Sequence, residues 1–104
     1  MTASGLTVSR EVIAEMVRLA AFEVPGVQHV GRSGPAWRRV FLAPAVHVRL
    51  RDGRVAVRVA IVARPGQPLA PLVAQVRAAV TATVERLLGL ELEAVSVVVD
   101  GVGG

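Results

Sequence analysis

The arrangement of apolar and polar residues predicts two amphipathic helices. Over residues 9–23 the apolar positions recur every three or four residues, and Ser9 is a suitable N-cap. A second helical pattern covers residues 69–88 and ends at Gly89, a natural C-terminal cap. The apolar residues that we expect these helices to bury are Val12, Ile13, Met16, Val17, Leu19, Ala20, Phe22, Val24, Leu72, Val73, Val76, Val80, Val84, Leu87 and Leu88. Each helix must lay its apolar stripe against another layer of structure.

Residues 46–62 predict a β-hairpin. Apolar and polar residues alternate on both sides of Asp52-Gly53, a preferred sequence for a two-residue turn in which both residues have positive φ. The face that we expect to be buried consists of Val46, Val48, Leu50, Val55, Val57, Val59 and Ile61. Because side chains alternate along a strand, the other face carries the polar residues, which include several arginines.

Shorter patterns complete the fold. Residues 27–31 and 94–100 are rich in valine, which favours strands, whereas residues 32–44 have no period and predict a loop. The glycine-rich tail at 101–104 is expected to fray. The element order is therefore α-β-β-β-α-β, and we predict an α+β fold in which two helices pack on one face of a small, mostly antiparallel sheet. A chain of 104 residues suits a single domain, with its core over about residues 6–102.

The composition argues against catalysis. The chain has no cysteine, and its two histidines, His29 and His47, do not lie in a metal-binding spacing. No serine lies in a nucleophile motif. Glu91 and Glu93 are better explained as solvated residues at the start of a strand than as an acid and base pair. We therefore expect no enzymatic activity, no metal, no cofactor and no small-molecule substrate.

The sequence predicts neither secretion nor a membrane span. The first residues lack the basic and apolar stretches of a signal peptide. No apolar run approaches the roughly 18 residues that a membrane helix needs. We expect a cytoplasmic protein, and we expect any association with a membrane to depend on a partner.

Positive charge is concentrated on the polar face of the predicted hairpin. The formal net charge is +4, and the basic residues of this face are His47, Arg49, Arg51, Arg54 and Arg58. Pairing across the turn places Arg51 opposite Arg54 and His47 opposite Arg58, and like charges in such positions reduce stability. This face is a candidate surface for an anionic partner, such as an anionic lipid surface or RNA. The alternative is that its long side chains are simply solvated.

The predicted loop supplies two further candidates. Residues 31–34, Gly-Arg-Ser-Gly, fit the GxxG loop with which KH domains clamp a nucleic-acid backbone, although that loop joins two helices and this one follows a predicted strand. Trp37, Arg38, Arg39 and Phe41 combine residue types that are enriched at the centres of protein interfaces. These four residues form a candidate docking loop, unless the two aromatic rings cover an edge of the core.

Two separated segments resemble a known family. Residues 8–15 read Val-Ser-Arg-Glu-Val-Ile-Ala-Glu, and residues 23–27 read Glu-Val-Pro-Gly-Val. Residues 84–92 read Val-Glu-Arg-Leu-Leu-Gly-Leu-Glu-Leu, and residues 94–102 read Ala-Val-Ser-Val-Val-Val-Asp-Gly-Val. In content and order these segments resemble the alkaline shock protein family, small bacterial proteins linked to cell-envelope stress. The resemblance covers about residues 6–102, but Arg64-Pro65, Leu88 and Ser96 depart from the usual residues and the hairpin face is more basic.

The resemblance implies a function without catalytic residues. It implies a non-enzymatic cytoplasmic protein that is held near the membrane by a membrane-anchored partner and is prone to self-association. We therefore expect an interaction or scaffold protein of the envelope stress response or of envelope homeostasis, acting through protein–protein contacts. Two alternatives stay open: a KH-like nucleic-acid-binding module that uses the arginine-rich hairpin face, and an accessory subunit that regulates an enzyme.

Overall fold

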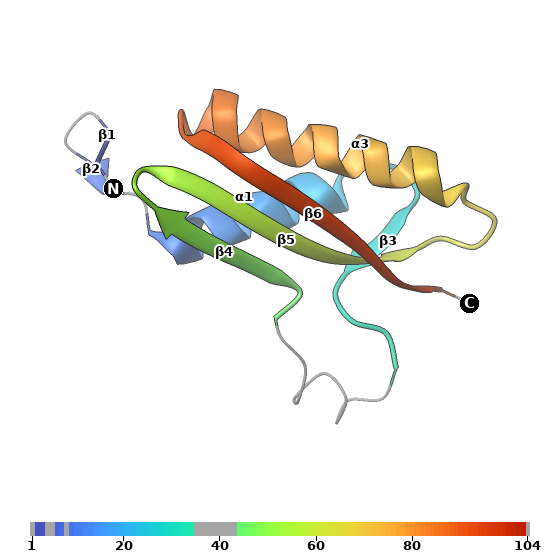
Figure 1. Ribbon diagram of the computed structural model, residues 1–104. Coiled ribbons are helices and arrows are strands. Elements are labelled where there is room, and N and C mark those ends of the chain that lie inside the picture. The colour runs from blue at the N-terminus through green and yellow to red at the C-terminus, as the bar shows by residue number, and fades with distance from the viewer. Residues whose placement is uncertain (1, 4–5, 8, 35–43, 104) are drawn as a thin grey trace.

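The computed structural model, which describes residues 2–3, 6–7, 9–34 and 44–103, has two layers: helices cover one face of a four-stranded sheet (Figure 1). The elements are β1 (Thr2–Ala3), β2 (Leu6–Thr7), α1 (Arg10–Phe22), β3 (Val27–Val30), β4 (Val46–Arg51), β5 (Arg54–Ala63), α3 (Leu69–Ala82), its π-helical continuation η1 (Thr83–Leu87), and β6 (Glu91–Val102). The predicted α+β class and the order α-β-β-β-α-β are confirmed. The pairing of β1 with β2 ahead of α1 is an addition that the sequence pattern did not predict.

β5 is the central strand of the sheet. Along one edge it pairs antiparallel with β4 and then with β3, and along the other edge it pairs parallel with β6 over its whole length. Ala60 marks the change of partner, because its N–H donates to Ala45 O (2.7 Å) and its carbonyl accepts from Gly31 N (3.0 Å). β3 and β4 therefore lie end to end on the same edge of β5.

The hairpin of β4 and β5 has the predicted turn and register. Asp52 and Gly53 have φ values of 52° and 76°, as a turn with two left-handed residues requires. In the observed register Arg51 pairs with Arg54 and His47 pairs with Arg58. The helix-facing residues Val48, Val55, Val57, Val59 and Ile61 are buried, and Val46 and Leu50 are half-buried against the same core.

The helices complete the core, although one predicted stripe is too wide. Ser9 caps α1 as predicted, since its Oγ accepts a hydrogen bond from Val12 N (3.2 Å). The fully buried helical residues are Ile13, Val17 and Ala21 of α1, Leu72, Val76 and Val80 of α3, and Val84 of η1. In contrast to the prediction, Val12, Leu19 and Phe22 are 50%, 41% and 49% exposed. Ile13, Val17 and Ala21 define the side of α1 that faces the sheet, and these three exposed residues lie outside it.

The C-terminal region differs from the prediction in three places, and the first is that β6 begins at Glu91 and not at residue 94. Leu87 was expected to be buried but is 66% exposed. The change from α-helix to π-helix at Thr83, marked by the bond from Leu88 N to Thr83 O (3.0 Å), rotates the following residues away from the phase of α3. Residues 101–103 do not fray, because β6 continues to Val102 and Gly103 N donates to Ala63 O (2.8 Å).

Candidate functional site

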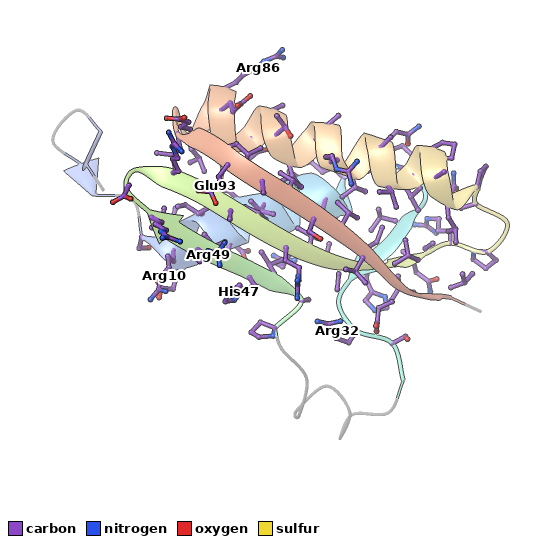
Figure 2. All side chains as sticks on the ribbon, viewed as in Figure 1. Arg10, Arg32, His47, Arg49, Arg86 and Glu93 are labelled. Carbon is purple, nitrogen blue, oxygen red and sulfur yellow. The ribbon has the colours of Figure 1, made fainter. Side chains whose placement is uncertain are left out.

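The face of the sheet opposite the helices carries the predicted basic residues. His47, Arg49 and Arg51 on β4 and Arg54 and Arg58 on β5 are all exposed. They alternate with the buried residues of the same two strands, so they point away from the helices. Figure 2 labels two of them, His47 and Arg49, on β4. We refer to these five residues as the arginine face.

Three guanidinium groups of the arginine face have no carboxylate partner among the residues that the structure describes. Arg54 forms an exposed ion pair with Glu91 of β6 (Nε to Oε1, 3.4 Å). Arg49, Arg51 and Arg58 form no salt bridge within the described part of the chain. All eight Asp and Glu residues of the protein belong to that part. The charge on these three arginines is therefore compensated only by solvent or by a bound partner.

The arginine face surrounds two shallow hollows. The larger, of about 420 Å³, has a floor of small residues on β5 and β6, and it is lined by His47, Arg49, Ala56, Val57, Arg58, Ala94 and Ser96. The second, of about 380 Å³, lies beside the hairpin turn and is lined by Arg51, Asp52, Arg54 and Glu93. Most of the lining residues are exposed. The surface suits an extended anionic partner better than an enclosed small molecule.

Two β-bulges in β6 place carboxylates on the open face. The pairing register between β5 and β6 shifts by one residue at two places along β5, between Val55 and Ala56 and between Ile61 and Val62. The unpaired extra residues on β6 are Glu93 and Asp100. A bulge inserts one residue into a strand and redirects a side chain. The sequence carries a signal for both bulges, because the apolar spacing lengthens from two to three at Leu92–Val95 and at Val99–Val102.

Asp100 ties the segment after β3 to the end of β6. Its Oδ2 accepts a hydrogen bond from Ser33 N (2.8 Å), its Oδ1 lies 3.6 Å from Arg32 Nη1, and its backbone oxygen accepts from Ser33 Oγ (2.6 Å). The Arg32 and Asp100 side chains are only 17% and 11% exposed. A Cβ on Gly101 would lie 2.7 Å from Ser33 Oγ, so the contact also requires glycine at that position. The Ser33 N–H therefore serves the fold and is not presented to a phosphate.

The other candidates fall into two groups. Trp37, Arg38, Arg39 and Phe41, the candidate docking loop, lie outside the described residues, and their role stays a prediction. Among the residues that the structure does describe, no three His, Asp or Glu side chains gather in a way that could hold a metal ion. No helix in those same ranges is long and apolar enough to cross a membrane.

Similarity to solved structures defines the class of fold. The chain superposes on the manganese form of a variant of the MamM CTD with a TM-score of 0.64 and 20% identity, covering 89% of this chain and 99% of that one. The copper form of the MamM CTD gives a TM-score of 0.65 and 19% identity, covering 88% and 85%. At this identity the similarity shows a shared α+β fold and no more.

The sequence comparison identifies the family. Residues 2–103 match the model of the alkaline shock protein 23 family, which is described as having a cell envelope-related function. The match spans nearly the whole chain, and the chain belongs to this family. No curated protein matches it.

Proposed function

We propose that this chain is a non-enzymatic interaction protein of the envelope stress response or of envelope homeostasis, and that it binds an acidic segment of a membrane-anchored protein through its arginine face. The observation that carries the proposal is the set of three exposed arginines, Arg49, Arg51 and Arg58, that have no carboxylate partner among the described residues. The family's cell envelope-related description supports the setting. The protein would then be cytoplasmic and held near the membrane by that partner.

The shape and charge of the arginine face favour an extended acidic partner. Two like charges lie directly opposite each other, because Arg51 is across from Arg54, and this is unfavourable in the free protein. A carboxylate-rich segment laid along the floor of Ala56, Ala94 and Ser96 would reduce that repulsion. Binding would therefore be weakened by salt, because exposed charges are screened at high ionic strength.

RNA binding is less well supported than binding of an acidic protein segment. Apart from the imidazole of His47, the arginine face has no aromatic ring on which a base could stack. The Gly-Arg-Ser-Gly segment at residues 31–34 also uses the Ser33 N–H to bind Asp100 (2.8 Å), where a KH-type loop would hold a nucleic-acid backbone. No observation specifically favours an accessory subunit that regulates an enzyme.

A charge-matched pull-down tests the proposal. The variant Arg49→Gln/Arg51→Gln/Arg58→Gln should fold normally and lose the membrane proteins that crosslink to the wild-type chain in the native host. The control Arg10→Gln/Arg77→Gln/Arg86→Gln removes the same charge from exposed sites on the helices and should keep them. Equal capture by both variants would disprove the role of the arginine face. Capture of RNA or ribosomal proteins in place of membrane proteins would favour the nucleic-acid alternative.

A further inference from the structure

β6 has an edge without a partner strand. In the described part of the chain it pairs only with β5, and Figure 1 shows it as the outermost strand on the side of α3. It is also the longest strand, with 12 residues from Glu91 to Val102. The N–H and C=O groups of residues 94–99 that point away from β5 pair with no other strand in the described part of the chain, and they can pair with a strand of a partner.

The apolar residues of β6 show that this side of the core is incompletely covered. On β5 the helix-facing residues Val55, Val57, Val59 and Ile61 are at most 3% exposed. On β6 the corresponding residues Leu92, Val95, Val97 and Val99 pack against the same core but are only half-buried. The difference arises because β5 has strands on both sides and β6 has a strand on one side only. One further strand beside β6 would cover this row.

The centre of β6 lacks the features that usually protect an edge strand. Natural edges carry charged residues, prolines or bulges that discourage pairing. β4, at the opposite edge, follows this rule, since it has only six residues and three of them are His47, Arg49 and Arg51. On β6 the bulges at Glu93 and Asp100 lie toward the two ends, and residues 94–99, Ala-Val-Ser-Val-Val-Val, contain neither charge, glycine nor proline.

The charges of β6 favour a second copy of this chain in antiparallel orientation. Parallel pairing of two copies would place Glu91 and Glu93 beside their own counterparts, and adjacent like charges are unfavourable. Antiparallel pairing about a two-fold axis moves these carboxylates to opposite ends of the interface and matches the uncharged centres with each other. The segment is therefore complementary to itself in one orientation, as a closed symmetric dimer requires.

We propose that two copies of this protein pair edge to edge through residues 94–99 of β6, antiparallel, to form one continuous eight-stranded sheet. The two-fold axis of such a pair is perpendicular to the sheet, so both arginine faces lie on the same side. A partner with two acidic segments would then bind both faces at once and gain avidity without any new contact. The pairing edge shares Ala94 and Ser96 with the floor of the larger hollow. The pairing uses the backbone groups of these residues and not the arginines, so it stands whether or not the arginine face binds the proposed partner.

A charge-swap experiment tests the pairing. Ser96 and Val98 are exposed on the open side of β6. In any antiparallel register centred on residues 96–98, Ser96→Glu/Val98→Glu brings carboxylates opposite or next to each other across the interface. Sedimentation velocity should show a dimer for the wild type and a monomer for this variant. Ser96→Arg/Val98→Arg should also be monomeric, and an equal mixture of the two variants should form dimers again.

Two controls separate the interface from effects on folding. Within the chain Ser96 pairs with Arg58, so a glutamate at position 96 is compatible with the sheet, and circular dichroism should be unchanged. Ala74→Glu/Ala78→Glu adds the same charge to exposed sites on α3 and should remain dimeric. A wild type that stays monomeric at every concentration, or Glu and Arg variants that dimerise alone as well as the wild type does, would overturn the proposal. The Arg49→Gln/Arg51→Gln/Arg58→Gln variant should still dimerise, so failure of one proposal is distinguishable from failure of the other.

Discussion

Alternate residues of β5 form two faces with opposite properties. Toward the helices, Val55, Val59 and Ile61 are completely buried, whereas Arg54 and Arg58 on the other side are exposed. The helix-side face excludes water and contributes to the free energy of unfolding. The open face leaves cationic groups available at little cost to that free energy. The comparison shows that stability and binding are assigned to different residues of the same strand, so each can be changed separately.

The largest expected effect comes from the buried face. Ile61→Ala removes a fully buried side chain from the middle of the core and should lower the free energy of unfolding by about 2–5 kcal/mol. Arg58, on the open side of the same strand, supplies the control, since Arg58→Ala should change stability by no more than about 0.5 kcal/mol. Denaturant unfolding of the two variants measures the difference. Equal effects would show that the two faces are not separated as described.

An intermediate effect is expected at Asp100, where a carboxylate and its partners are largely buried. Asp100→Ala leaves the Ser33 N–H and the Arg32 guanidinium without the carboxylate that they bind, and should cost about 1–3 kcal/mol. Glu93→Ala, at the other bulge of β6, removes an exposed carboxylate and should have little effect. Thermal unfolding of both variants provides the measurement. If Glu93→Ala were the more destabilising change, the anchoring role of Asp100 would be wrong.

The smallest expected effect concerns an arginine that does have a carboxylate partner. Arg18 on α1 donates hydrogen bonds to Glu15 (Nε to Oε1, 2.9 Å), and these bonds hold the pKa of Glu15 below its usual value. A lowered pKa in the folded state contributes stability above the pKa of the unfolded chain, and this contribution is lost as the pH falls through the folded value. Because the pair is exposed, the contribution to stability is small.

An NMR titration tests this pair directly. Arg18→Gln should raise the pKa of Glu15 toward its ordinary value. Arg49→Gln, on the open face, should leave it unchanged, because Arg49 has no salt bridge to any carboxylate of the described chain. An unchanged pKa in the Arg18 variant would mean that the pair does not persist in solution.

Local signals in the sequence account for the parts of the fold that were predicted correctly. The hairpin followed from strict alternation around Asp52-Gly53, and the start of α1 followed from the capping residue Ser9. Both depend on residues that are close together in the chain. The same alternation placed every residue of the arginine face on the exposed side, so the position of this candidate site was available before the structure.

Features that depend on distant contacts or on a change of helical phase were missed. Ser33 and Asp100 are 67 residues apart, and neither residue carries a local sign of the other. Leu87 fits an α-helical stripe, and only the π-helical turn that begins at Thr83 explains why its side chain is exposed. The prediction also buried too many residues of α1. Periodicity shows which side of a helix is apolar, but it does not show how much of the helix surface is covered by neighbouring elements.

The change of partner strand at Ala60 also indicates where additional residues can be inserted into this protein. The chain leaves the sheet after Gly31 and returns at Ala45, and both residues bond to the backbone of Ala60. The two ends of the intervening segment are therefore held by one residue of the central strand, whatever the length of chain between them. Tolerance to insertion depends on the burial and hydrogen bonding of the affected backbone, and here the backbone hydrogen bonds to Ala60 lie outside the intervening segment. We expect homologues to differ most in length at this point, and an epitope tag or a reporter domain inserted here should leave the sheet intact.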